Sequence, residues 1–90
     1  MLIRVHITVT GDVQGVGFRY FARKLSNNMG IKGYARNMPD RSVELEIECD
    51  ESSTAEFLHK LKNEHPWARV NDIKTTVLPY QGTYSGFEIR

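Results

Sequence analysis

Apolar and polar positions along the chain follow two repeats, one of period two and one of helical period. Residues 3–9 alternate apolar and polar side chains, which predicts a strand with one buried face. Residues 43–49 show the same alternation, and their polar positions are Glu44, Glu46 and Glu48. We expect these three carboxylates to lie on a solvated face of a half-buried strand.

Two stretches have the helical repeat. Residues 18–29 place apolar side chains on one face, and Gly30 is positioned to end that helix in a left-handed cap. A second helix is predicted to begin at Ser53, with Glu56 at capping-box spacing, and to stop before Pro66.

The remaining strands are predicted over residues 31–37, 70–78 and 87–89, with an irregularity at Asn71-Asp72 and a turn over residues 38–41. The resulting order is strand, helix, strand, strand, helix, strand, with a short closing strand. It is typical of an α+β, ferredoxin-like sandwich, in which an antiparallel sheet carries two helices on one face. We expect the opposite face to be largely exposed.

A glycine-rich stretch, Gly11 to Arg19, lies between the first predicted strand and the first predicted helix. Such a loop can turn several main-chain N–H groups toward one point, and the helix start adds unpaired donors there. Arg19, in the first helical turn, could clamp two phosphate oxygens. Asp12 should point to solvent, since an inward carboxylate would repel an anion. A plain strand-to-helix turn remains the alternative at this point.

The stretch differs from the common nucleotide loops. A P-loop needs Gly-Lys-Ser/Thr, but Val16 follows Gly15 and Phe18 follows Gly17. A dinucleotide fingerprint needs a third glycine where Tyr20 stands, and 90 residues leave no room for its larger parallel sheet. The pattern therefore favours a small anion over a nucleotide.

Composition limits the function classes further. The length fits a single domain over residues 1–90, and 12 Lys and Arg against 11 Asp and Glu give a formal charge of +1. No charged field gathers nucleic acid or a membrane surface, and no signal-peptide or membrane-spanning run is present. Cys49 is the only cysteine, which excludes an intrachain disulfide and a zinc-binding cysteine pair. A reducing, cytoplasmic location is expected.

Two stretches of the chain resemble the signature motifs of a known family. The stretch Gly11 to Arg19, and the later stretch Gly33-Tyr34-Ala35-Arg36-Asn37-Met38-Pro39-Asp40, resemble the two signatures of the acylphosphatase family. The resemblance extends over nearly the whole chain, including its Gly-Phe-Glu-Ile ending. It implies a small cytosolic hydrolase of ferredoxin-like fold that cleaves the carboxyl-phosphate bond of acyl phosphates to a carboxylate and inorganic phosphate.

The resemblance also implies residue roles. By motif position, Arg19 would be the phosphate-binding catalytic arginine, and Asn37 would orient the attacking water. The backbone cradle, which phosphate or sulfate could also occupy, would be formed by Gln14, Gly15, Val16, Gly17 and Phe18. Two departures are Ala35, where valine is common, and Arg41, where glycine is common. Arg41 predicts a different turn type or slight strain.

Hydrolysis of an acyl phosphate requires few functional groups on the protein. A carboxylate leaving group has a conjugate acid of pKa about 4 to 5, so no general acid is needed. Positioning and electrostatics dominate phosphoryl transfer, and we expect neither a metal nor a cofactor. We expect a monomer acting on a small-molecule acyl phosphate.

An RNA-binding module and a metal carrier fit the sequence less well. An RNA-binding module would expose aromatic side chains on its central strands, where this chain has glutamates, and a metal carrier would need two cysteines. An inactive relative that only binds phosphate or a partner protein stays open. The tyrosines are scattered along the chain, and none is singled out as a substrate contact: Tyr20, Tyr34, Tyr80 and Tyr84.

Overall fold

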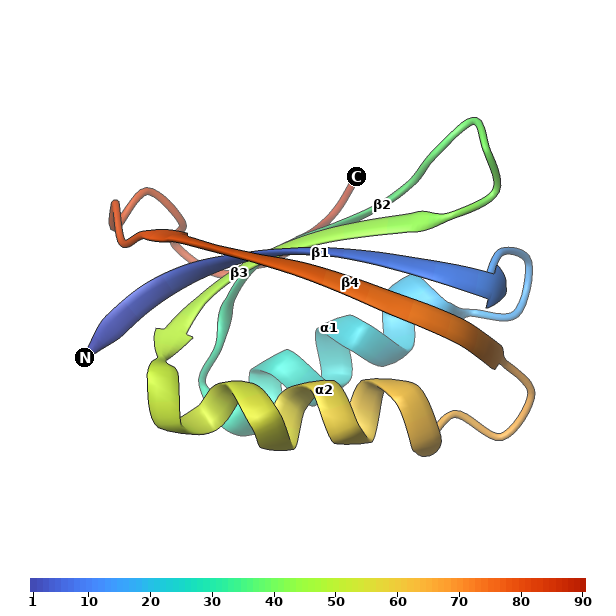
Figure 1. Ribbon diagram of the computed structural model, residues 1–90, viewed down its shortest axis with the longest axis horizontal. Coiled ribbons are helices and arrows are strands. Elements are labelled where there is room, and N and C mark those ends of the chain that lie inside the picture. Colours follow the sequence, from blue (N-terminus) through green and yellow to red (C-terminus); the bar gives the residue numbers. More distant parts are fainter.

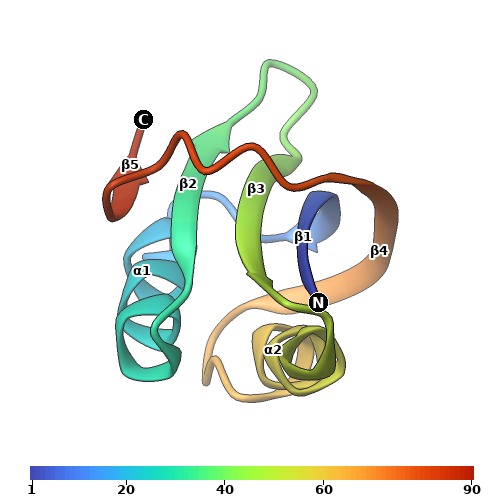
Figure 2. The ribbon, with the colours of Figure 1, turned by 90° about the vertical axis from the view of Figure 1, so that its left-hand side faces the viewer.

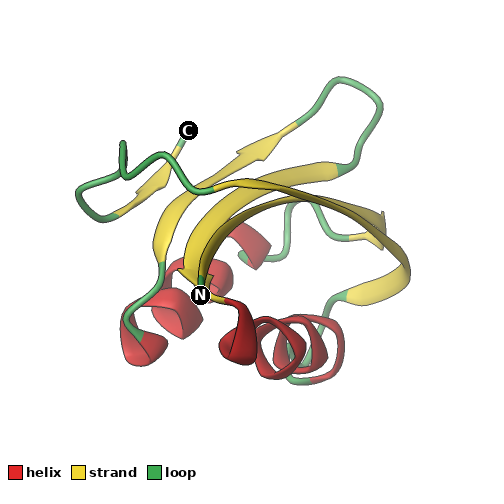
Figure 3. Cartoon of the chain, turned by 60° about the vertical axis from the view of Figure 1, so that its left-hand side comes forward, coloured by secondary structure: helices red, strands yellow, loops and turns green.

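The protein consists of a five-stranded sheet with two helices packed on one of its faces (Figures 1 and 3). The computed structural model describes all of residues 1–90. In chain order the elements are β1 (Leu2–Asp12), α1 (Phe18–Met29), β2 (Lys32–Asn37), β3 (Val43–Asp50), a 3₁₀ turn η1 (Glu51–Ser53), α2 (Thr54–Asn63), β4 (Arg69–Pro79) and β5 (Phe87–Ile89).

The strands are ordered β4-β1-β3-β2-β5 across the sheet. The pairs formed by β1, β2, β3 and β4 are antiparallel, and this arrangement confirms the predicted ferredoxin-like fold. The short β5 pairs with β2 in the parallel direction, so the sheet is mixed where an antiparallel one was predicted. No helix has the length and apolar character needed to span a membrane.

The core lies between the sheet and the helices. Alternation puts Val5 and Ile7 of β1 and Leu45 of β3 on the inner face, where they are fully buried. Phe57 and Leu61, one turn apart on α2, are also fully buried against them. Each such side chain contributes about 1.5–3 kcal/mol by leaving water, so this face holds the two layers together.

The outer face of the sheet is covered over β2 and β3, where the prediction of an open, solvated face was wrong, while Lys74 and Thr76 of β4 are exposed. Residues 80–86 cross from β4 over β3 and β2 to reach β5 (Figure 2). Glu48 on β3 is 6% exposed, and its Oε2 accepts hydrogen bonds from the amides of Gln81 (2.8 Å) and Gly82 (3.2 Å). Arg4 of β1 donates to the same oxygen at 3.1 Å. Glu48 thus binds the crossing segment to the sheet.

The same face carries a second set of paired polar groups. Glu44 accepts hydrogen bonds from Tyr34 (3.0 Å) and Arg36 (2.7 Å) and is 2.9 Å from His6 Nε2. Burial, together with the hydrogen bond to Glu44, raises the pKa of Tyr34 to about 12. Tyr34 is itself buried, so it offers no open stacking surface.

The start of α2 also differs from the prediction. The Ser53 side chain makes no capping bond, so the capping box with Glu56 is wrong. Asp50 caps the preceding turn instead, with Oδ1 accepting from the amide of Ser52 at 3.0 Å. An Asp followed by a polar turn competes with the capping box because its side chain can bond its own backbone two residues on.

The irregularity predicted in β4 is present. Thr10 of β1 pairs with Asp72, whereas the next residue, Gly11, pairs with Val70. Asn71 is therefore the extra residue of a β-bulge, located beside the start of the glycine-rich loop.

Candidate active site

The loop between β1 and α1 takes its shape from two glycines. Gly15 has φ 78° and Gly17 has φ 74°, both in the left-handed region that side chains disfavour. A Cβ at either position would meet nothing within 4 Å, so glycine is required by conformation and not by lack of space. Gly17 is also the N-cap residue of α1, so the loop leads directly into a helix start.

The loop presents unpaired hydrogen-bond donors. None of the main-chain N–H groups of residues 13–17 donates to another group of the protein. The first residues of α1 add amides that have no partner within the helix, and its first turn contains no acidic side chain. Free donors at a positive helix end favour a small anion, so the anion site stays a prediction that this geometry suits.

The Gln14 side chain ties this loop to the β2–β3 hairpin. Its Nε2 donates to the main-chain oxygens of Met38 and Ser42, each at 2.9 Å. One side-chain amide thus fixes the spacing between the loop and the end of β2. The sequence suggested only a main-chain role for Gln14, because nothing in the pattern indicated which carbonyls it would meet.

Arg19 and Asn37 line one small cavity beside the loop. Its volume is about 80 Å³. The lining residues are Val13, Gly15, Gly17, Phe18, Arg19, Tyr20 and Asn37. The two predicted catalytic residues and three of the five predicted cradle residues are therefore brought together, whereas Gln14 and Val16 are not on the lining. Sequence reasoning missed Val13 and Tyr20.

The guanidinium of Arg19 is anchored at one end. Its Nη1 donates to the main-chain oxygen of Arg90 at 3.0 Å, and no other protein group accepts from it. Arg90 is held in turn by a hydrogen bond from its amide to the Ala35 oxygen at 2.9 Å. Since a guanidinium has five N–H donors, most of those of Arg19 have no acceptor in the protein.

Asn37 ends β2, where it pairs with Val43 of β3. Its side-chain amide has no hydrogen-bond partner in the protein, so both its N–H and its C=O groups can serve a ligand or water. The end of β2 thus fixes the position of Asn37 on the lining of the loop cavity.

The hairpin after Asn37 contains the departure noted at Arg41. Arg41 has φ 75°, so a bulky residue takes a left-handed conformation there. Its amide donates to Met38 O at 3.1 Å, and Asp40 Oδ1 accepts from the Ser42 amide at 3.0 Å. The expected strain is present, and the turn is kept by these hydrogen bonds.

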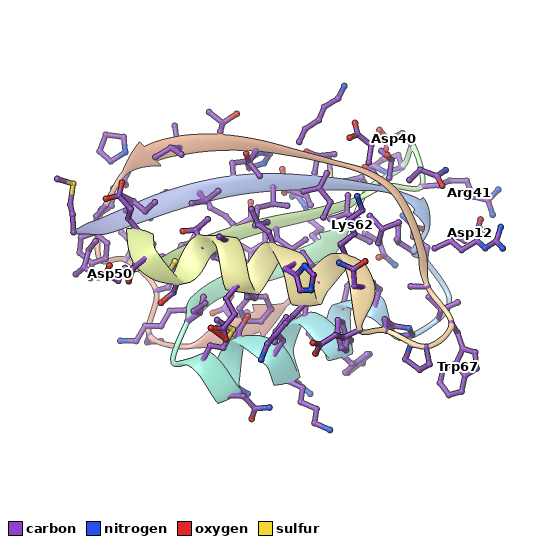
Figure 4. All side chains as sticks on the ribbon, turned by 60° about the horizontal axis from the view of Figure 1, so that its bottom comes forward. Asp12, Asp40, Arg41, Asp50, Lys62 and Trp67 are labelled. Atoms are coloured by element: carbon purple, nitrogen blue, oxygen red, sulfur yellow. The ribbon has the colours of Figure 1, made fainter.

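The side chains of Asp12 and Trp67 are not part of the cavity lining. Asp12 is exposed and projects outward at this end of the molecule, as does Trp67 (Figure 4). No group of three or more His, Cys, Asp or Glu side chains is placed to hold a metal ion. The polar groups of the candidate site are therefore backbone amides, the Arg19 guanidinium and the Asn37 carboxamide, and Phe18 and Tyr20 are also on its lining.

Comparisons with known proteins agree on one family. A family model described as acylphosphatase matches residues 5–89. The chain is 45% identical over 85 residues to an acylphosphatase of Caldanaerobacter subterraneus subsp. tengcongensis, covering 94% of each protein. It is 38% identical over 88 residues to one of Archaeoglobus fulgidus, with 98% of each covered.

A solved structure gives the same result. The crystal structure of acylphosphatase from Bacillus subtilis superimposes with a TM-score of 0.92 at 34% identity, covering 100% of this chain and 99% of that one. Sequence and fold both match over almost the entire length. The chain therefore belongs to the acylphosphatase family, whose members are hydrolases of acyl phosphates.

Proposed function

We propose that this enzyme hydrolyses acyl phosphates by holding the phosphoryl group in the loop cavity, with Arg19 as its phosphate-binding catalytic residue and Asn37 as the residue that orients water. One observation carries the proposal. Arg19, Asn37 and the two left-handed glycines line a single small cavity next to unpaired loop amides.

The main task of the site is to stabilise the negative charge on the phosphoryl oxygens. In phosphoryl transfer the transition state is loose, with negative charge spread over three equatorial oxygens. The loop amides of residues 14–18 and the free N–H groups of Arg19 would donate to these oxygens. Donors that are fixed before the reaction need not reorganise during it, and losing one typically costs on the order of 100- to 1000-fold in rate.

The attacking water would be placed by Asn37. A carboxamide accepts one hydrogen bond from water and donates another, so it can aim the water at phosphorus without acting as a strong base. The new bond forms between the water oxygen and phosphorus, and the bond from phosphorus to the carboxyl oxygen breaks. The carboxylate leaves with the bonding electrons, and the water's proton passes to a phosphate oxygen.

The direct test is hydrolysis of benzoyl phosphate by the purified protein, with inorganic phosphate as a competitive inhibitor. We expect turnover that phosphate inhibits competitively and that EDTA does not diminish. Phosphate binding without turnover would instead support the inactive, phosphate-binding relative considered above. A rate lost in EDTA and restored by added metal would show that the account has missed a metal ion.

The domain organisation, oligomeric state and location of the protein are also proposed. We propose that residues 1–90 act as a single domain and as a monomer in the cytoplasm. The buried free thiol of Cys49 fits a reducing compartment. Sedimentation of the purified protein at the mass of one chain would support the monomer, and a concentration-independent dimer would refute it.

A further inference from the structure

The loop cavity cannot enclose a whole substrate. Its volume of about 80 Å³ compares with the 300–1,000 Å³ of pockets that surround drug-sized ligands. A phosphoryl group fills such a space, so the acyl part of an acyl phosphate must lie outside the cavity. Whatever recognises the acyl group must therefore be an exposed side chain at the rim.

Only one side chain of the lining meets this requirement. Val13 and Phe18 are buried, Gly15 and Gly17 have no side chain, and Arg19 and Asn37 are assigned to the phosphoryl group and water. Tyr20 remains, and it is 57% exposed. Single exposed aromatics are ordinary on protein surfaces, but this one borders the cavity in which the reaction would take place.

The position of Tyr20 on the helix inclines its side chain toward the end of α1 at which the cavity lies. Tyr20 is the third residue of α1, and helical side chains slant toward the helix N-terminus, which here is the anion site. The Arg23 guanidinium lies over the ring, 5.3 Å from its centroid. This cation–π contact holds the ring in place and leaves more than half of the residue open to solvent.

We propose that Tyr20 is the residue that recognises the acyl group, by stacking against planar, apolar acyl groups such as an aromatic ring. The proposal rests on the proposed hydrolysis of acyl phosphates. Arg23 acts on the substrate only through Tyr20 and is therefore a positioning residue. Aromatic pairs contribute enough beyond area burial to change affinity by about 2- to 12-fold.

The test compares kcat/KM for benzoyl phosphate with kcat/KM for acetyl phosphate, which has no ring to stack. We expect Tyr20→Ala to lower the ratio of the two by about 5-fold, mainly through KM for benzoyl phosphate. Tyr20→Phe keeps the ring and should keep the ratio. Arg23→Gln should lower the ratio less than Tyr20→Ala, since the ring remains but is less well held.

Tyr80→Ala is the matched control, because Tyr80 is another exposed tyrosine and lines a different cavity, with Leu2 and Asp50. It should leave the ratio at the wild-type value. If Tyr20→Ala also leaves the ratio unchanged while the wild type hydrolyses both substrates, the assignment of Tyr20 is wrong and the proposed function stands. If the wild type hydrolyses neither substrate, the proposed function is wrong, and the role of Tyr20 that rests on it is wrong with it.

Discussion

Arg19 Nη1 donates a 3.0 Å hydrogen bond to the main-chain oxygen of Arg90, which joins the first turn of α1 to the residue after β5. A cation near a helix N-terminus is mildly unfavourable, so this contact helps to hold the guanidinium where an anion is expected. The fork of the guanidinium allows one nitrogen to be anchored while the others stay free. Arg19 thus has a structural contact and a proposed catalytic role at the same time.

Arg19→Lys keeps the positive charge at this position but removes the planar guanidinium. An ammonium is a point charge, and it cannot donate to Arg90 O and also present a planar fork to phosphate. We expect kcat/KM for benzoyl phosphate to fall by about 100-fold or more, with the fold unchanged by circular dichroism. A lysine variant with near wild-type activity would show that the fork is not used.

Gln14→Ala should loosen the loop. The variant removes two hydrogen bonds, which costs about 1–2 kcal/mol in the free energy of unfolding, while the Met38 and Ser42 oxygens each keep one main-chain donor. Urea denaturation measures that loss, and the kcat of the variant should fall because the cradle is less well placed. Gln14→Glu is the stricter comparison: a carboxylate facing two carbonyl oxygens should be worse than alanine.

Arg41→Gly should stabilise the protein. Arg41 has φ 75°, a conformation that costs an L-residue about 1 kcal/mol and that glycine adopts freely. We expect the free energy of unfolding to rise by about 0.5–1 kcal/mol, partly offset by glycine's greater freedom when unfolded. Arg41→Ala, which removes the same side chain but keeps a Cβ, should show no such gain. Since Arg41 is not on the lining of the cavity that holds Arg19 and Asn37, kcat/KM should stay at the wild-type value.

Glu48 makes stability depend on acid pH. Burial opposes its ionisation, but the amides of Gln81 and Gly82 and the Arg4 side chain outweigh that effect and hold its pKa below the ordinary value. The native state therefore binds this proton more weakly than the unfolded chain does. The stabilisation is present above the unfolded pKa of about 4.3 and is lost as pH falls through the lower native pKa.

The check is a series of urea denaturations from pH 7 to pH 3 on Glu48→Gln. At pH 7 we expect the variant to lose about 1.5–3 kcal/mol, because Arg4 loses one of its two carboxylate partners and the Gln81 and Gly82 amides lose a charged acceptor. The difference from wild type should shrink as pH falls from about 4.3, where the unfolded carboxylate takes up its proton, through the lower native pKa of Glu48. Glu88→Gln, which alters an exposed pair with Arg90, should give parallel curves. A constant difference at every pH would contradict the account.

Much of the fold could be predicted from the sequence because its elements have consistent periodicity. Residues 3–9 and 43–49 alternate over enough positions to specify one buried face, and Gly30 ends α1 in the predicted left-handed conformation. The bulge at Asn71 was also predictable, since two polar residues interrupt an apolar strand. Gly33 weakened the pattern of β2 for a reason that appears only in the fold: a Cβ there would lie 1.8 Å from Glu46 O.

The outer face and the rim of the site were not predictable in the same way. Glutamates alternating with apolar residues normally indicate a solvated face, and the segment that covers them, residues 80–86, has no periodicity. Two of the three partners of Glu48 are main-chain amides, which no sequence pattern indicates. Tyr20 follows the arginine of the first motif directly, but only the cavity distinguishes it from the other tyrosines.

The central claim is a division of labour between Arg19 and Asn37, so the most direct measurement compares their alanine variants. Calorimetric titration with inorganic phosphate gives binding, and benzoyl phosphate hydrolysis gives turnover. We expect Arg19→Ala to lose both phosphate binding and turnover, with kcat/KM reduced by about 1000-fold or more. We expect Asn37→Ala to lose turnover while its Kd for phosphate stays within about 3-fold of wild type. Equal loss of phosphate affinity in the two variants would contradict the assigned roles.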